Sequence, residues 1–168
     1  RMTGMLKAGD IAPEFILPNE NGKEVALTRR LQDSAVILYF YPADFSPGCT
    51  KESCAIRDIH DEILSAGLEV IGISPQDEER HRRFKEKHDL PFTLISDPNK
   101  IAIRMYDANG PMGFGVRRIT YLVGQDQRIQ GAVCADLKIT KHDEFIKQAI
   151  MLRETDTMKN QADAKRPA

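Results

Sequence analysis

Two cysteines separated by five positions, Cys49 and Cys54, stand where the sequence best suits covalent chemistry. An apolar run ends at Pro42, a turn-rich loop follows, and Cys49 falls at or within the first turn of a predicted helix. The thiolate is the nucleophilic form of cysteine, whereas a free thiol with a pKa of about 8.5 is mostly protonated at neutral pH. Unpaired N–H groups and the positive dipole end of a helix favour the anion. The position of Cys49 therefore predicts a nucleophilic thiol.

Groups that would assist such a thiol lie on both sides of it and later in the chain. Ser46 comes three residues before Cys49, where its hydroxyl could donate to the sulfur or to a bound oxygen atom. A permanent cation is also needed, because negative charge builds up on the leaving group. Arg117 and Arg118, which open a predicted strand, are both candidates, and local reasoning leaves the choice open. Glu52 is either a helix-cap carboxylate or the partner of a nearby arginine.

The composition excludes several other classes of protein. The chain has 168 residues, which fits one domain, and its 24 Lys plus Arg nearly balance 25 Asp plus Glu, which argues against a nucleic-acid binder. No apolar run approaches the roughly 20 residues that span a bilayer, and the N-terminus lacks the apolar stretch of a signal peptide. Three cysteines are too few for a secreted disulfide framework. We therefore expect a cytoplasmic protein that binds neither nucleic acid nor membrane.

The elements that must position these groups alternate between strand and helix patterns. The predicted strands cover residues 15–17, 25–27, 34–41, 68–74, 91–96, 119–123 and 129–133, and the predicted helices cover residues 50–66, 78–88, 99–106 and 141–152. The first two strands form a hairpin across the Asn21-Gly22 turn. The run over 34–41 suits a strand that is buried on both faces. The fold class is therefore α/β, with a central mixed sheet flanked by helices and an N-terminal β-hairpin.

The chain divides into one domain and two flanking segments. Residues 1–7 are interpreted as an N-terminal extension, in which Arg1 before Met2 suggests an expression remnant. Residues 8–152 carry the strand and helix patterns and form the domain. Residues 153–168 are polar and lack a sustained apolar face, so this tail is expected to be frayed.

The segment around Cys49 resembles the signature of the peroxiredoxins. Residues 42–49 read Pro-Ala-Asp-Phe-Ser-Pro-Gly-Cys, which is similar to the family pattern Pro-x-x-x-Thr/Ser-x-x-Cys. The continuation through residues 50–58 resembles the bacterioferritin comigratory protein (PrxQ) branch. The resemblance covers roughly residues 8–152, including the stretches 9–15, 96–98 and 115–123.

This resemblance implies a thioredoxin-like fold and a peroxidase that needs no cofactor and reduces hydrogen peroxide and organic hydroperoxides, with a part in antioxidant defence and cell redox homeostasis. Cys49 would be the peroxidatic cysteine and become a sulfenic acid, and Cys54 would resolve it as an intramolecular disulfide. Pro42, Ser46 and Arg118 match the remaining active-site positions, with serine at 46 where most members carry threonine. Thioredoxin or glutaredoxin would reduce the disulfide, and the protein would be a monomer or a weak homodimer.

Helix geometry limits how Cys49 and Cys54 can bond. On one ideal helix, residues five apart are displaced by about 7.5 Å along the axis and about 140° around it, so their Cα atoms are about 8.6 Å apart. A disulfide normally needs no more than about 7 Å between these atoms. We therefore predict that oxidation to a disulfide unwinds the first helical turns.

Rival interpretations fit these residues less well. A thiol–disulfide oxidoreductase on the same fold favours Cys-x-x-Cys, which the five-residue spacing does not match. A holdase-like or interaction module with incidental thiols leaves the set of active-site residues unexplained. A metal site made of Cys49, Cys54 and His60 lacks the paired Cys-x-x-Cys units of zinc sites.

The remaining candidate residues receive structural interpretations. Cys134 ends a predicted strand and is expected to be a small buried hydrophobe. The Gly-rich stretch 107–115 is either a flexible connection or a segment whose Met112 and Phe114 line the mouth of the site or a subunit contact. The four histidines stand among polar residues and are expected to be solvated: His60, His81, His88 and His142.

Overall fold

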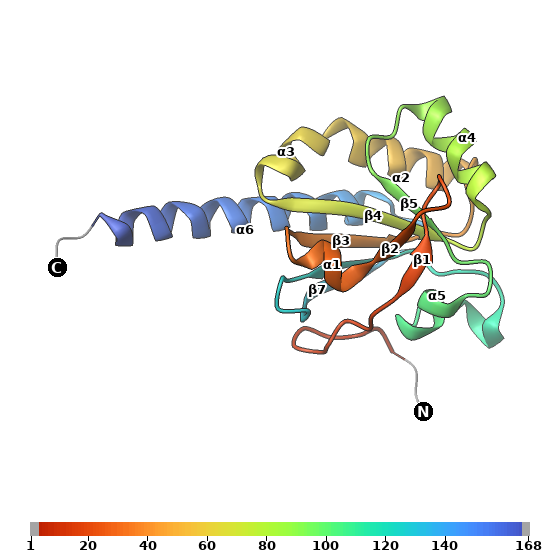
Figure 1. Cartoon of the computed structure of the whole chain (residues 1–168), viewed down its shortest axis with the longest axis horizontal. Coiled ribbons are helices and arrows are strands. Elements are labelled where there is room, and N and C mark those ends of the chain that lie inside the picture. The colour runs from red at the N-terminus through yellow and green to blue at the C-terminus, as the bar shows by residue number, and fades with distance from the viewer. Residues whose placement is uncertain (1–3, 166–168) are drawn as a thin grey trace.

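A five-stranded mixed sheet with helices on both faces forms the body of the computed structural model, which describes residues 4–165 (Figure 1). The elements in chain order are β1 Ile16–Pro18, β2 Glu24–Ala26, α1 Leu27–Leu31, β3 Ala35–Phe40, α2 Pro47–Asp58, α3 His60–Ser65, β4 Leu68–Ser74, α4 Glu78–His88, β5 Thr93–Ser96, α5 Ile101–Met105, the 3₁₀ turn η1 Pro111–Gly113, β6 Ile119–Val123, β7 Ile129–Cys134 and α6 Thr140–Ala164. The strand order is β5-β4-β3-β6-β7, and β1 and β2 form the predicted separate hairpin. Strands β3, β4 and β5 are mutually parallel, β6 is antiparallel to β3, and β7 is antiparallel to β6. The mixed sheet and the thioredoxin-like α/β class are therefore confirmed.

Strand β3 lies at the centre of the sheet and is buried on both faces. All six of its residues are buried, as the unbroken apolar run predicts. The pleat sends alternate side chains to opposite faces. One set, with Ile37 and Tyr39, packs with residues of α2, α3, α4 and α6, whereas the other, with Leu38 and Phe40, packs with the hairpin, α1 and α5. After Phe40, the last residue of β3, the chain enters the loop and the helix α2 that carry Cys49.

The helix predicted over residues 50–66 is two helices in the structure. Helix α2 ends at Asp58 and α3 begins at His60, because Ile59 has non-helical backbone angles of φ −113° and ψ 15°. The apolar periodicity continues across the break, which is why the sequence pattern does not reveal it. Helix α1 was not predicted, since its five residues are too few for a periodic pattern.

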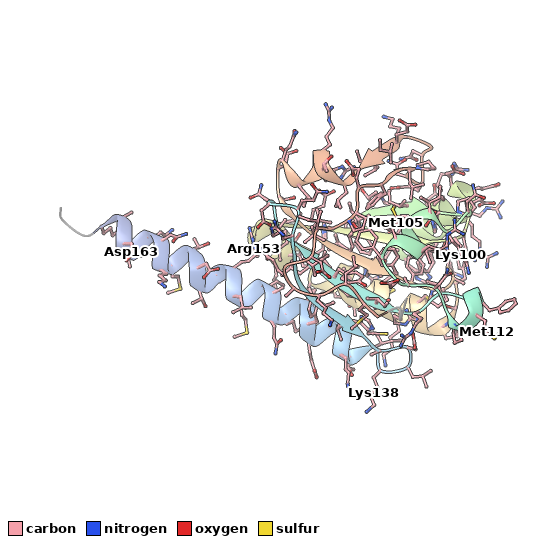
Figure 2. The ribbon with its side chains drawn as sticks, turned by 90° about the horizontal axis from the view of Figure 1, so that it is seen from below. Lys100, Met105, Met112, Lys138, Arg153 and Asp163 are labelled. Carbon is pink, nitrogen blue, oxygen red and sulfur yellow. The ribbon has the colours of Figure 1, made fainter. Side chains whose placement is uncertain are left out.

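Helix α6 runs past its predicted end at residue 152 and continues to Ala164. Arg153 ties this helix to the body, since its Nε donates to the Ala66 carbonyl at 2.7 Å. Beyond this residue the helix projects away from the sheet and is exposed (Figures 1 and 2). The expectation of a frayed tail is therefore wrong up to Ala164, and residues 166–168 lie outside the described range. Within residues 4–165 no helix is both long and apolar enough to cross a bilayer.

The described part of the N-terminal extension contacts the core. Met5 and Leu6 pack against the cluster on the hairpin side of the sheet, and the Leu6 N–H donates to the Tyr121 hydroxyl at 3.3 Å. Packing thus begins before residue 8, whereas residues 1–3 lie outside the described range.

Candidate active site

Cys49 lies in the first turn of α2. The helix follows Ser46, whose extended backbone (φ −70°, ψ 146°) makes it the N-cap residue, and Pro47 occupies the first helical position. Proline suits this position because its ring fixes a helical φ and its missing N–H would have no intrahelical partner. The N–H groups of Gly48 and Cys49 likewise have no carbonyl four residues earlier in the helix. The positive end of α2 is therefore beside the sulfur, where it favours an anion.

Arg118 reaches this sulfur from the neighbouring strand. It directly precedes β6, whose antiparallel pairing places Ile119 opposite Phe40 at the end of β3. The Nη2 atom of Arg118 donates to Cys49 Sγ at 3.3 Å, and the residue is buried. Arg117, the alternative that local sequence reasoning left open, is half exposed and faces Asp136 at 3.7 Å. The structure therefore brings Arg118, not Arg117, to Cys49.

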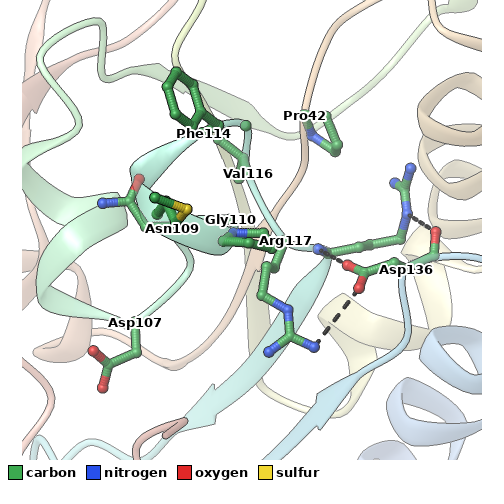
Figure 3. Close-up of a pocket in the computed structure, with 12 residues that line it drawn as sticks. Pro42, Asp107, Asn109, Gly110, Phe114, Val116, Arg117 and Asp136 are labelled. Atoms are coloured by element: carbon green, nitrogen blue, oxygen red, sulfur yellow. Dashed lines mark hydrogen bonds and ion pairs between the residues drawn. The ribbon is translucent and has the colours of Figure 1, made fainter. Parts of the chain in front are cut away.

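Asp136 holds Arg118 in place through two hydrogen bonds, and Gly48 leaves space for the guanidinium. The Asp136 Oδ1 atom accepts from the Arg118 backbone N–H at 2.8 Å, and the Asp136 carbonyl accepts from Nε at 3.5 Å (Figure 3). Gly48 leaves room for the guanidinium, since a Cβ there would lie 3.1 Å from Nη2 and 3.4 Å from Ile139 Cδ1. A side chain at position 48 would thus press on the arginine that contacts the sulfur.

Glu52 lies fully buried one helical turn beyond Cys49 and accepts from Arg118 Nη1 at 2.8 Å through Oε1. Of the two interpretations of Glu52, the arginine partner is the one observed. Its Oε2 atom has no described hydrogen-bond donor and lies 3.5 Å from His142 Nδ1. His142 Nε2 donates to the Ala135 carbonyl at 2.9 Å, which leaves Nδ1 to accept from the Thr120 hydroxyl at 2.8 Å. Burial lowers the pKa of His142, which agrees with this neutral tautomer.

Burial raises the pKa of Glu52 from 4.5 to about 7, while the charge of Arg118 acts in the opposite direction. Below about pH 7, a protonated Glu52 accepts the Nη1 hydrogen bond without competing as a second anion for the single positive charge of Arg118. The guanidinium charge then remains available to the sulfur.

Replacing Glu52 with glutamine is expected to flatten the pH dependence of stability. The folded protein holds the Glu52 proton up to about pH 7, whereas the ordinary value in an unfolded chain is 4.5. Because the folded state binds more protons in this window, the free energy of unfolding falls as the pH rises through it, by about 3 kcal/mol. The Glu52→Gln variant should lack this fall. Urea unfolding of both reduced proteins at about pH 4.5, 6 and 8 measures the difference, and parallel pH profiles would contradict it.

The Ser46 hydroxyl makes a hydrogen bond within the loop that precedes α2. Its Oγ donates to the Ala43 carbonyl at 2.9 Å. A hydroxyl carries one hydrogen, so Ser46 does not donate to the sulfur here, in contrast to one of the expectations from sequence. Its acceptor lone pairs and a rotation of the hydroxyl remain available to a bound molecule.

A pocket of about 540 Å³ opens beside Arg118 (Figure 3). Its lining residues come from the end of β3, the stretch before β6 and the segment after β7, namely Pro42, Asp107, Asn109, Gly110, Pro111, Met112, Phe114, Gly115, Val116, Arg117, Arg118 and Asp136. Met112 and Phe114 are strongly exposed, at 94% and 78%. Both residues line the pocket and are exposed, and their role at the mouth of the site or in a subunit contact stays a prediction.

The residues that line this pocket include Arg118 but none of the three cysteines. Cys54 is half-buried in α2, the same uninterrupted helix as Cys49, and all three cysteines are free thiols. Cys49 and Cys54 therefore share one helix, as predicted. Cys134 packs partly buried against the core at the end of β7, and burial raises the pKa of its thiol.

Two histidines that were expected to be solvated are fully buried, so that expectation is wrong for His81 and His142. The other two, His60 and His88, are half-buried. The signal was helical spacing: His81 stands three residues before the buried Phe84, and His142 four residues before the buried Ile146. This spacing places both rings on the buried faces of α4 and α6.

Comparison with known proteins identifies the family. The model of the AhpC/TSA family matches residues 8–132. The peroxiredoxin Bcp of Escherichia coli is 40% identical over 147 residues, which cover 84% of this chain and 93% of that protein. The crystal structure of peroxidoxin BcpB from Mycobacterium tuberculosis, 27% identical, matches with a TM-score of 0.82 over 88% of this chain and 97% of the other. The bacterioferritin comigratory protein of Xanthomonas campestris, 24% identical, shares the fold with a TM-score of 0.76 over 83% and 92% of the two chains. The chain therefore belongs to the AhpC/TSA family, as a peroxiredoxin of its Bcp/PrxQ branch.

Proposed function

We propose that Cys49 is the peroxidatic cysteine and that it reduces hydrogen peroxide and organic hydroperoxides. The observation that carries this proposal is the 3.3 Å contact between Cys49 Sγ and Arg118 Nη2 at the N-terminal turn of α2. The thiolate attacks the terminal oxygen of the hydroperoxide, so that an S–O bond forms and the O–O bond breaks. The departing alkoxide or hydroxide takes a proton from water, and Cys49 becomes a sulfenic acid.

The neighbouring groups stabilise the charge that moves during this step. Arg118 remains charged throughout, so its guanidinium can stabilise first the thiolate and then the oxygen that departs. The unpaired N–H groups of the first α2 turn add the positive end of the helix beside the sulfur. Pro42 lines the pocket beside Arg118, and the Ser46 hydroxyl hydrogen-bonds the bound peroxide after rotating away from Ala43.

We further propose that Cys54 is the resolving cysteine. Its thiolate attacks the sulfenic sulfur of Cys49, an S–S bond forms, and hydroxide leaves as water after protonation. Both residues lie within α2, so the first turns of this helix must unwind before the sulfurs meet. Thioredoxin, or a glutaredoxin, then reduces the disulfide by thiol–disulfide exchange and restores both thiols.

Replacing Cys54 with serine is expected to permit one oxidation and stop recycling through the intramolecular disulfide. Without the second thiol, one equivalent of peroxide should leave Cys49 as a sulfenic acid. Steady-state NADPH consumption in the presence of thioredoxin and its reductase should then fall to the background rate. Mass spectrometry under non-reducing conditions should identify a Cys49–Cys54 linkage in the native protein and none in the variant.

Cys134→Ser is the matched control, since it removes a partly buried thiol outside α2. This variant should retain both turnover and the disulfide. A Cys54→Ser protein that consumes NADPH at the native rate would refute the resolving role, and loss of the disulfide in Cys134→Ser would assign that role to Cys134.

A further inference from the structure

The loop between β3 and α2 contains a residue in an unfavourable backbone conformation. Phe45 has a φ of 65°, in the left-handed region that bulky side chains rarely adopt. The next residue, Ser46, is the N-cap of the helix that carries Cys49. Such strain persists only where surrounding contacts hold it in place. The contacts that hold this loop therefore bear on the position of the reactive sulfur.

A buried pair ties the loop to α4. Asp44 and His81 are both fully buried, and Asp44 Oδ2 contacts His81 Nδ1. The Tyr41 hydroxyl donates to Asp44 Oδ1 at 2.6 Å, and His81 Nε2 donates to the Ile95 carbonyl at 3.0 Å. Because the Ile95 oxygen can only accept, the His81 ring uses Nε2 as a donor there and shares one proton with Asp44 through Nδ1. The pair thus connects the loop to both α4 and β5.

A second set of contacts holds the ring of Phe45 against the same helix. The ring packs edge-to-face on Phe84, with centroids 5.2 Å apart. The guanidinium of Arg80 and the ammonium of Lys87 lie 5.7 Å and 5.8 Å from the ring centroid, within the range of cation–π attraction. Together with His81, these three residues of α4 form what we call the α4 clamp.

We propose that the α4 clamp, made of Arg80, His81, Phe84 and Lys87, holds the strained loop 42–46 in the conformation that presents Cys49 to Arg118, and that its release lets Cys49 reach Cys54. Asp44 and His81 are thus positioning residues. The strain at Phe45 favours release, whereas the clamp opposes it. The balance between them sets how much of the protein has the first turn of α2 unwound.

The expected effect of the clamp on disulfide formation rests on the proposed resolving role of Cys54. Its expected effect on the unwinding of α2 does not. Peroxide reduction requires the folded turn, because Arg118 meets Cys49 only there. Disulfide formation requires the unwound turn, because the intact helix keeps the two cysteines apart. A weaker clamp should therefore slow the first step and speed the second.

Two variants weaken the clamp in different ways. Asp44→Asn keeps the shape of the side chain and removes its charge, and His81→Leu removes the ring. In Asp44→Asn, weakening of one hydrogen bond should raise the unwound population, and with it the rate of disulfide formation from the sulfenic acid, by about fivefold. His81→Leu loses the contacts with both Asp44 and Ile95, so its acceleration should be larger than that of Asp44→Asn. The rate is measured by mixing reduced protein with one equivalent of hydrogen peroxide, quenching with a thiol-blocking reagent and analysing the products by mass spectrometry.

Lys85→Met is the matched control. Lys85 also belongs to α4 and pairs with the buried Glu20, but it ties α4 to the β-hairpin rather than to the loop. This variant should lose a comparable ion pair and leave the rate of disulfide formation unchanged. A fivefold acceleration in Lys85→Met as well would overturn the assignment of the effect to the clamp.

Amide hydrogen exchange of the reduced protein tests the clamp without any disulfide. The Thr50 N–H donates to the Ser46 carbonyl at 2.9 Å, so its exchange reports opening of the first turn. Exchange at Thr50 should be about fivefold faster in Asp44→Asn than in the native protein and in Lys85→Met, and faster still in His81→Leu. Unchanged exchange overturns the clamp. Faster exchange with no Cys49–Cys54 disulfide in the native protein instead supports the clamp and refutes the resolving role.

Discussion

Replacing Cys49 with serine is expected to reduce the rate of peroxide consumption to that of buffer alone. The proposed reaction uses the sulfur electron pair of a thiolate, and a serine hydroxyl stays protonated at neutral pH and is a weak nucleophile without a base. The substitution exchanges one atom in a fully buried site and should leave the fold intact. The measurement is peroxide consumption by stoichiometric reduced protein, followed by NADPH-coupled turnover with thioredoxin and its reductase.

The remaining cysteines provide the controls for this experiment. Cys54→Ser and Cys134→Ser should each still consume one equivalent of peroxide, because both retain Cys49 and Arg118. Near-ultraviolet circular dichroism of Cys49→Ser should match that of the native protein, since several tyrosines pack near the site. Peroxide consumption by Cys49→Ser above the buffer rate would show that the reactive sulfur is another cysteine.

Local signals in the sequence explain why some elements could be predicted with their boundaries. Helix α4 runs over the predicted residues 78–88. Asp77 caps its N-terminus by accepting from the Arg80 N–H at 2.8 Å, and Asp89 ends it in a left-handed conformation. Both ends are thus decided by side chains within a few positions, which sequence reasoning can evaluate.

Tertiary interactions explain the elements and burial states that sequence reasoning missed. The break at Ile59 falls inside a continuous apolar pattern, and α6 continues past Arg153 without a face to bury. His81 and His142 stand in polar surroundings along the chain, yet each meets its partners from other elements in space. Local polarity therefore indicated solvent where the fold supplies hydrogen-bond partners.

In the candidate active site, too, some features follow from the local sequence and others depend on tertiary contacts. The position of Cys49 at a helix start follows from the loop and helix around it. The contact with Arg118 spans 69 positions of the chain, so it depends on the pairing of β6 with β3. Local reasoning could not choose between Arg117 and Arg118, and the resemblance to the peroxiredoxins made that choice. Asp44 carried no such signal, because its partner lies on a helix whose charged run looks solvated.

Replacing Arg118 with methionine is expected to lower kcat/KM for peroxide by about 10²- to 10³-fold. Methionine keeps most of the length of the chain but supplies neither the charge nor the two hydrogen bonds to Cys49 and Glu52. The thiolate and the departing oxygen would then lose their nearest cation. Burial should keep Glu52 neutral in this variant, so the loss should appear in the rate of Cys49 oxidation more than in stability.

Arg117→Met and Arg118→Lys separate charge from geometry in this prediction. Arg117 lines the same pocket but faces Asp136, so its replacement should change kcat/KM by no more than about twofold. Lysine at 118 restores the charge but cannot hold Glu52 and Cys49 with two donors in one plane, so it should recover only part of the lost rate. Stopped-flow oxidation of the reduced proteins at fixed ionic strength measures all three. Equal losses in Arg117→Met and Arg118→Met would indicate a general effect of positive charge at the pocket and would contradict a specific role for the guanidinium that contacts the sulfur.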